Sequence, residues 1–254
     1  MLYTFENTLT DLAGGSTLTV LPNCGGSLSA NDPCNNATSF GTDGAGPYWT
    51  WTSPALNGGG FRVTTNQLIG STYTMILKLS FRSTGPGYRK IIDYKNRVSD
   101  TGFYFYQAGL LFYNLGSRQG SFAANEVLYL IVVRQAFAGV AGLFTVYSRV
   151  EGGGLQLLVN VTDSTGQSIP FTSGNGSFLG FFYDDLSSQG EATSGGKAYT
   201  LQMWENIALT PSQLAAEITN GAFIQQNLEP PSSPPLRHHI LFSILSSSSF
   251  LLPP

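Results

Sequence analysis

Apolar and polar residues alternate along most of the chain, and this two-residue period predicts β-strands. In the stretch YTMILKLSF, residues 73–81, the odd positions are apolar and the even positions are mostly polar. The alternation predicts a long strand that buries one face. The stretches RKIIDYKN, GFYFYQAG and LLFYNLGS follow, with Gly or Asn between them, and predict a meander of short strands.

The pattern continues through the second half of the chain. The stretch EVLYLIVVRQ, residues 126–135, is almost entirely apolar, so we expect both of its faces to be covered. LFTVYSRV and LQLLVNVTD lie on either side of three glycines and predict a hairpin, and GSFLGFFYDD and KAYTLQMWEN complete the set. About a dozen strands with almost no helix predict an all-β fold, an antiparallel β-sandwich of the jelly-roll type.

One short helix is predicted near the end of the patterned region. Thr210 is placed as its N-cap, Pro211 as its first residue and Gln213 as the residue that completes a capping box. Leu214 and Ile218 share one face of this helix. We expect that face to pack on the rim of the sandwich.

The strand before this helix, residues 197–206, is expected to close the sandwich by pairing with residues 2–5. Alternation divides its side chains between two faces, with Tyr199, Leu201 and Met203 on one and Thr200, Gln202 and Trp204 on the other. Glu205 is then expected to face water, with no second carboxylate beside it.

Composition divides the chain into two parts. Residues 1–226 carry the strand and helix patterns and predict one domain. Residues 227–254 open with a linker rich in Pro and Ser and continue as an apolar tail. The apolar part is shorter than the ~20 residues of a membrane-spanning helix, so we expect no transmembrane span. We interpret the tail as a disordered segment or a sorting signal.

Charged residues are sparse and mixed in sign. Twelve Lys and Arg stand against fifteen Asp and Glu, which gives a net charge of -3. The basic residues are scattered singly, whereas nucleic-acid binding needs a basic stripe or patch, so we exclude that function. Few charges with abundant Gly and aromatic residues are typical of extracellular β-sheet proteins.

The two cysteines bear on the compartment. Cys24 and Cys34 flank GGSLSANDP, a polar loop rich in turn-forming residues that can bring the two sulfurs together. We predict a disulfide between them, the alternative being two unpaired buried thiols. Because disulfides persist in oxidising compartments, we expect a secreted or cell-surface protein.

Two stretches of the chain carry a family resemblance. YTFENTLTDLAGG has an aromatic strand and a turn, and YTLQMWENIALTPSQLAAE has a strand and a helix. With GGFRVTTNQLIGSTYTMILKLSF they resemble the concanavalin A-like lectin/glucanase superfamily, and within it the laminin G-like jelly-roll domains. The matching positions are Tyr3, Phe5, Asp11, Gly14, Ala208, Leu209, Thr210, Gln213 and Leu214. The resemblance covers residues 2–224 and implies rim loops that hold glycans or proteins, sometimes with a calcium ion.

Because the superfamily includes glycosidases, the carboxylates decide whether catalysis is expected. Retaining hydrolysis needs two carboxyl groups about 5–5.5 Å apart, and glucanases of this fold place Glu and Asp two residues apart on one strand. No Glu of this chain is followed by Asp at that spacing, and both histidines, His238 and His239, lie in the tail. We therefore expect no enzymatic activity. The alternatives are a divergent glycoside hydrolase and a purely structural domain of a larger surface protein.

Oxygen ligands that suit calcium occur in three places. The candidate ligands are Asp93 with Asn96, Asp163 with Asn160, and Asp184 with Asp185. The alternative for each is a turn-forming role, in which the side-chain oxygen binds the backbone of its own loop. No other cofactor is indicated.

The stretch GPYWTWTS supplies the candidate ligand-binding residues, Tyr48, Trp49 and Trp51. Exposed flat rings can stack on sugar faces, whereas the alternative is that Trp49 and Trp51 fill the edge of the core. The sequence as a whole predicts a non-catalytic extracellular recognition module. Its expected partner is a glycan or a protein of the cell surface or matrix.

Overall fold

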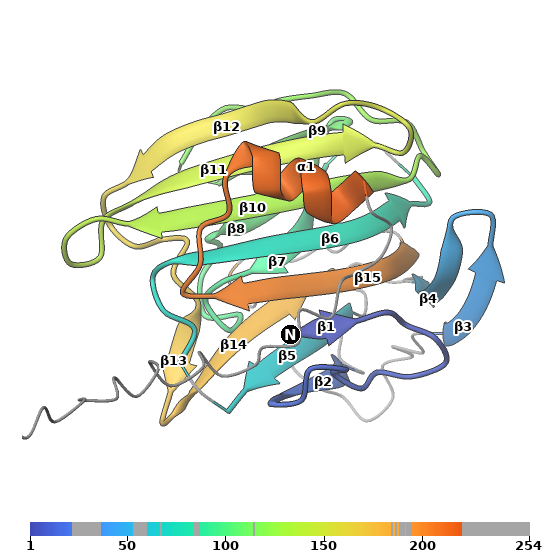
Figure 1. Ribbon diagram of the computed structural model, residues 1–254, viewed down its shortest axis with the longest axis horizontal. Coiled ribbons are helices and arrows are strands. Elements are labelled where there is room, and N and C mark those ends of the chain that lie inside the picture. The colour runs from blue at the N-terminus through green and yellow to red at the C-terminus, as the bar shows by residue number, and fades with distance from the viewer. Residues whose placement is uncertain are drawn as a thin grey trace, which may run out of the picture.

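The computed structural model describes residues 1–21, 37–52, 60–66, 68–83, 87–113, 115–183, 185, 187, 191 and 195–219. These residues form two antiparallel sheets and one short helix, α1 (Pro211–Thr219). Figure 1 shows the sheets stacked, with α1 lying across the outer face of one of them. The structure confirms the predicted all-β sandwich with a short C-terminal helix.

The first sheet has eight strands, in the order β12-β11-β10-β6-β15-β4-β3, and β1 also pairs with β15. The strands are β1 (Leu2–Tyr3), β3 (Ala37–Asp43), β4 (Gly46–Thr52), β6 (Tyr73–Phe81), β10 (Leu128–Ala136), β11 (Gly142–Val150), β12 (Gln156–Asp163) and β15 (Gly196–Glu205). The order places β6 and β15, far apart in the chain, side by side at the centre of the sheet.

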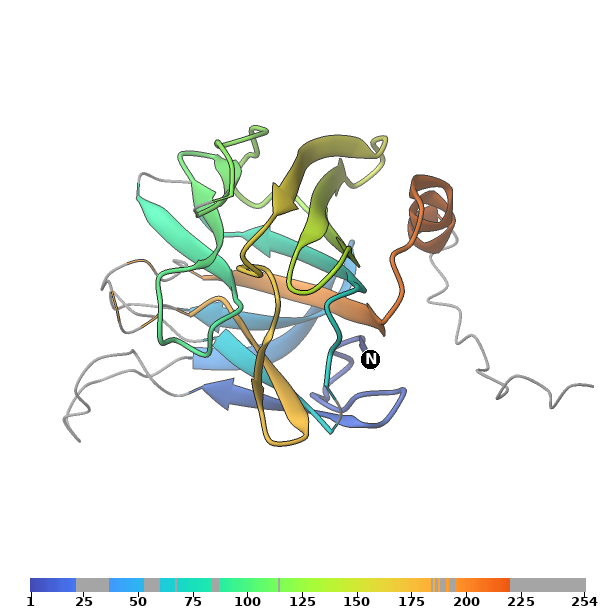
Figure 2. The ribbon, with the colours of Figure 1, turned by 90° about the vertical axis from the view of Figure 1, so that its left-hand side faces the viewer.

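The second sheet has seven strands, in the order β2-β5-β14-β7-β8-β9, and β13 also pairs with β14. The strands are β2 (Ser16–Leu21), β5 (Gly60–Thr65), β7 (Tyr88–Asp93), β8 (Gly102–Tyr106), β9 (Gly109–Phe112), β13 (Phe171–Ser173) and β14 (Gly176–Phe181). Strands β7, β8 and β9 form the predicted meander. Turned by 90°, the molecule has three layers, which are this sheet, the first sheet and α1 (Figure 2).

The core between the sheets is rich in stacked aromatic rings. Trp51 stacks on Phe182 with ring centroids 4.0 Å apart, and Trp49 meets Phe61 edge-on at 5.4 Å. Both tryptophans are at most 1% exposed. Because positions 49 and 51 lie two residues apart on β4, they share the inward face of the sheet.

Strand β6 departs from its prediction in one respect. Its odd residues enter the core as expected, but all nine residues are buried, so the strand is covered on both faces. The cover on the outer face comes partly from α1, because Ile76 packs in one cluster with Leu214 and Ile218 of the helix. Alternation within β6 could not reveal a helix that comes from the other end of the chain.

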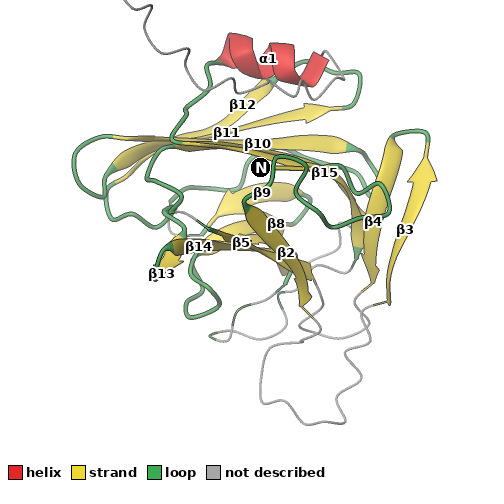
Figure 3. Ribbon diagram, turned by 60° about the horizontal axis from the view of Figure 1, so that its bottom comes forward, coloured by secondary structure: helices red, strands yellow, loops and turns green. Residues whose placement is uncertain are grey.

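The helix forms as its capping signals predict. Thr210 N donates to Gln213 Oε1 at 2.9 Å, and Gln213 N donates to Thr210 Oγ1 at 3.4 Å, which is the reciprocal pairing of a capping box. The side chain of Leu214 is fully buried. Figure 3 shows that α1 lies over the face of the first sheet, so it covers that face and does not sit on the rim.

Strand β15 closes the sheet as predicted, because Leu2 pairs with Gln202 and Tyr3 with Leu201. Its register to β6 shifts between Ala198 and Thr200, which leaves Tyr199 as an extra residue in a β-bulge. The bulge corrects the predicted face of Tyr199. Its ring leaves the side of Leu201, which is in the core, and contacts Lys78 of the outer face.

Several predicted features lie outside the described residues. They are Cys24 and Cys34 with their predicted disulfide, Asp184, and the linker and tail at 227–254. Within the part of the chain that is described, no helix is long and apolar enough to cross a membrane.

Candidate ligand-binding groove

A groove with a volume of about 360 Å³ lies on the outer face of the first sheet. Its floor comes from β6, β10 and β15, one side comes from α1, and the other comes from the turn that joins β3 to β4. The β3–β4 hairpin continues the first sheet beyond β15, and Figure 3 shows it turned out of the plane of β10 and β11. The groove therefore lies between the helix and the turn of this hairpin.

Lys78 is at the centre of the groove floor, and its ammonium is fully engaged by neighbours. Its Nζ donates to Ala45 O at 2.7 Å and to Glu151 Oε1 at 2.8 Å. The same nitrogen lies 5.5 Å from the ring centroid of Tyr129 and 5.3 Å from that of Tyr199. The two rings hold the lysine by cation–π contacts and leave it 8% exposed.

A second lysine–carboxylate pair borders the first. Lys197 Nζ donates to Asp43 Oδ2 at 2.6 Å and lies 4.4 Å from the ring centroid of Tyr48. Tyr199 Oη donates to the same Asp43 oxygen at 3.0 Å. Burial works to raise the pKa of Asp43, but the hydrogen bonds from Lys197, Ala45 N and Tyr199 outweigh it and hold that pKa below its ordinary value.

The bulge in β15 supplies two further groove residues. Tyr199 and Thr200 both line the groove, although neighbours on a regular strand face opposite ways. Burial raises the pKa of the Tyr199 hydroxyl to about 12, with a smaller contribution from Asp43 in the same direction. The hydroxyl therefore stays protonated. Thr200 is 7% exposed, and its Oγ1 is buried with no hydrogen-bond partner among the described residues.

The remaining polar residues of the groove are acidic or neutral. Glu6 is exposed at the mouth, and Glu217 projects from α1 and is half-buried. Burial raises the pKa of the Glu217 carboxyl. With the amide of Gln202 on the floor, the groove offers donors, acceptors and aromatic surface in one concave space, which is the composition of small-ligand sites.

The three aromatic candidates lie on opposite faces of β4. Tyr48 is half-buried and stands beside the groove, with its ring 5.8 Å from that of Tyr199. Trp49 and Trp51 point into the core, where neither has an exposed face for stacking on a sugar. The core position, left open as the alternative, holds for both. The two-residue period of the strand explains the split, because Tyr48 is next to Trp49 and faces the opposite side of β4 from Trp49 and Trp51.

Asp93 has a turn-forming role. It is 1% exposed, and its two carboxylate oxygens accept hydrogen bonds from Lys95 N at 3.1 Å and Arg97 N at 2.6 Å. Asn96 lies inside that turn with a positive φ of 50°, which Asn tolerates better than most residues. The carboxylate is committed to the backbone of its own loop, as the alternative for this pair anticipated.

Asp163 is likewise committed, in this case to an internal ion pair. It accepts from Gln167 N and from both Ser168 N and Ser168 Oγ, and it faces Arg134 at 3.6 Å. Asn160 is exposed, and its Oδ1 accepts from Thr145 Oγ1 at 3.1 Å. Residues 160 and 163 face opposite sides of β12, so the structure does not bring this predicted pair together.

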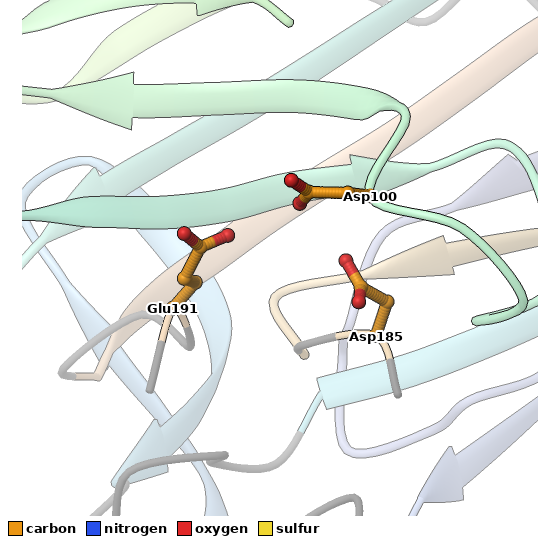
Figure 4. Close-up of side chains that lie close together, drawn as sticks. All are labelled: Asp100, Asp185 and Glu191. Carbon is orange, nitrogen blue, oxygen red and sulfur yellow. The ribbon is translucent and has the colours of Figure 1, made fainter. Parts of the chain in front are cut away.

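Asp185 lies in a cluster that the sequence did not suggest. Its carboxylate converges with those of Asp100 and Glu191, and ligand atoms from the three lie within 4.8 Å of one another (Figure 4). Two connections supply these residues, with Asp100 between β7 and β8 and both Asp185 and Glu191 between β14 and β15. Their oxygens suit a hard cation, yet Lys90 Nζ already bonds Asp185 and Tyr104 Oη donates to Asp100 at 2.7 Å.

We predict that calcium leaves the melting temperature of the protein unchanged. A divalent ion at the Asp100–Asp185–Glu191 cluster has to displace the buried ammonium of Lys90, which already neutralises part of its charge. Thermal unfolding in millimolar calcium and in chelator provides the measurement. A rise of several degrees with calcium, lost in Asp100→Asn, would contradict the prediction.

Glu205 is less exposed than its sequence position indicated. It is half-buried at the end of β15, and burial raises the pKa of its carboxyl. The charged amino terminus of Met1 lowers that pKa and Asp11 raises it, so one carboxylate does act on Glu205. The half-buried position corrects the expectation that Glu205 faces water.

Comparison with known proteins identifies the fold. No protein family and no curated protein sequence matches the chain. It is similar to the binding domain of botulinum neurotoxin serotype C1, with TM-score 0.55, 15% identity and coverage of 87% of this chain and 51% of that one. The binding domain of botulinum neurotoxin DC in complex with SialylT gives TM-score 0.53, 14% identity and coverage of 86% and 50%.

A third similar structure is of botulinum neurotoxin type C, whose cell entry depends on interaction with two ganglioside molecules. It gives TM-score 0.50 and 15% identity, and the match covers 86% of this chain and 50% of that one. The chain spans about half the length of these structures. At such identities the likeness establishes a shared β-sandwich fold.

Proposed function

We propose that this chain is a non-catalytic recognition module that binds carbohydrate in the groove beside α1. The observation that carries the proposal is the groove floor, where Tyr129 and Tyr199 flank Lys78 and the amide of Gln202 lies beside them. A concave site that combines aromatic surface with a few hydrogen-bonding groups is typical of small-ligand binding.

The chemistry of sugars fits this composition. A pyranose ring has a weakly apolar face that stacks on aromatic rings and a rim of hydroxyls that both donate and accept hydrogen bonds. The half-buried Tyr129 offers a ring face, while Gln202 and Glu151 offer hydrogen-bonding groups. The solved neurotoxin structures, one in complex with SialylT and another linked to gangliosides, support carbohydrate binding as a class and not the choice of a particular sugar.

The same residues argue against hydrolysis. A retaining glycosidase needs one carboxyl that stays protonated and a second that is free to attack. Glu151 and Asp43 are each bound to a lysine, so neither carboxylate is free to attack as a nucleophile. We also propose that the protein is secreted or lies at the cell surface and that it binds carbohydrate without calcium.

A glycan array with the purified chain tests the proposal. Thr200→Val is a control on the floor of the groove, because valine keeps the shape of threonine and removes only a hydroxyl that is closed to solvent. Since Thr200 Oγ1 makes no hydrogen bond within the described residues, we expect the melting temperature to stay level or rise and the binding of the captured glycan to stay unchanged.

Two tyrosine variants complete the test. Tyr129→Ala removes a ring of the groove and should reduce glycan binding, whereas Tyr113→Ala, at an exposed residue beyond β9 of the second sheet, should not. If both variants bind glycan equally well, the groove is not the binding site. Release of sugar from polysaccharides, lost in Glu217→Gln, would instead establish a hydrolase, and the absence of any glycan or protein ligand would favour a structural domain.

A further inference from the structure

The charges of the groove are unbalanced. Its lining contains one ammonium, that of Lys78, and three carboxylates, those of Glu6, Glu151 and Glu217. The neighbouring pair of Lys197 and Asp43 adds one charge of each sign. The groove is therefore negative at neutral pH, and any charged group that enters it meets this field at short range.

The positive charges in the groove are also committed. Lys78 Nζ is bound to Ala45 O and Glu151 Oε1 and lies against two rings, and Lys197 is bound to Asp43. Recognition of a carboxylate or sulfate depends on a cation that can donate to it without losing another partner. Neither lysine can turn to an anionic ligand without leaving a carboxylate unpaired.

Two acids of the groove, Glu6 and Glu217, add negative charge that no cation in the described part of the chain balances. Among the described residues, neither Glu6 nor Glu217 takes part in an ion pair. Glu217 is half-buried on the side of the groove that α1 forms, so its charge is only partly screened by water. Arg149 lies at the margin, 5.9 Å from the ring centroid of Tyr129, with its Nε bound to Gly153 O, and it does not line the groove.

We infer that the groove selects uncharged saccharides and rejects those that carry a carboxylate or a sulfate. This inference rests on the proposed carbohydrate function and assigns the ligand class within it. Glu6 and Glu217 are the residues that exclude acidic sugars, and the aromatic and amide groups hold the neutral ones. The selectivity is opposite to that of a site built around free arginines or lysines.

Matched pairs of sugars test the inference. The probes are galactose-, glucose- and N-acetylglucosamine-terminated oligosaccharides, each immobilised as the neutral compound, its sulfated form and its sialylated form. We expect the acidic forms to bind about tenfold or more weakly than the neutral form at low salt. The difference should narrow at about 0.5 M salt, where screening is strong.

Charge variants locate the effect. In the double variant E6Q/E217Q, the binding of neutral and acidic sugars should differ less than in the wild type. The control is E191Q, which removes a carboxylate near β7 and β8 of the second sheet and should leave that difference in binding unchanged. Preference for an acidic form, or binding of it that is lost in R149A, would overturn the inference and leave the carbohydrate function standing. Failure of every sugar to bind would overturn the carbohydrate function, and the inference with it.

Discussion

Replacing Trp51 by alanine is expected to destabilise the protein by about 3–5 kcal/mol, the usual cost of truncating a buried aromatic residue. The Trp51 ring is fully buried, stacks on Phe182 at 4.0 Å and lies 5.7 Å from the ring of Trp49. Its removal leaves a cavity at the centre of the sandwich that neighbouring strands cannot collapse to fill. Denaturant unfolding followed by tryptophan fluorescence or circular dichroism measures the loss.

Tyr48→Ala is the matched control, because this residue is on the same strand and lies on its opposite face, beside the groove. We expect it to cost less stability than Trp51→Ala and to affect glycan binding more. If Trp51→Ala instead abolished binding and left the free energy of unfolding unchanged, Trp51 would be a ligand platform and the core assignment would be wrong.

The second large effect is expected at Asp163, whose replacement by alanine should cost about 3–5 kcal/mol. The change leaves the guanidinium of Arg134 buried without its carboxylate, and Arg134 has no exposed surface. It also removes the acceptor for three hydrogen bonds from Gln167 and Ser168. Thr162→Ala, at an exposed neighbour on β12, should change stability by no more than about 0.5 kcal/mol.

The same carboxylate makes a predictable contribution to acid sensitivity. Burial tends to raise the pKa of Asp163, but the hydrogen bonds from Ser168 and Gln167, with Arg134, hold it below its ordinary value. A carboxyl with a lowered pKa stabilises the fold above its unfolded-state pKa of about 3.9, and this stabilisation is lost as the pH falls toward the folded-state pKa. The stability difference between wild type and D163N should therefore be constant near neutrality and shrink below about pH 4. A difference independent of pH would contradict the shift.

Local signals in the sequence predicted the elements well. Thr210 and Gln213 predicted the start of α1 because a capping box involves residues only three apart. Alternation along β6 and the short apolar run of β10 predicted strands, because both patterns are properties of each strand alone. The pairing of β1 with β15 followed from the resemblance to a known architecture, and the register confirms it.

The groove could not be predicted, because its residues meet only after folding. Glu6, Lys78, Tyr129 and Glu217 come from four regions of the chain, and no spacing among them signals a site. The bulge at Tyr199 is set by how β15 matches β6, which the pattern of β15 does not contain. Asp185 was predicted as a ligand beside Asp184, but its meeting with Asp100 and Glu191 could not be predicted for the same reason.

The central place of β15 has a consequence for how the chain matures in the cell. Strand β15 is bonded to β6, β4 and β1, yet among the described residues it is the last strand in chain order. Until β15 pairs, β6 and β4 each keep one open hydrogen-bonding edge, which is a template for pairing with other chains. Partners so distant in sequence also close slowly. We therefore expect the yield of folded protein to fall as the concentration of folding chains rises, because open edges on two chains compete with β15.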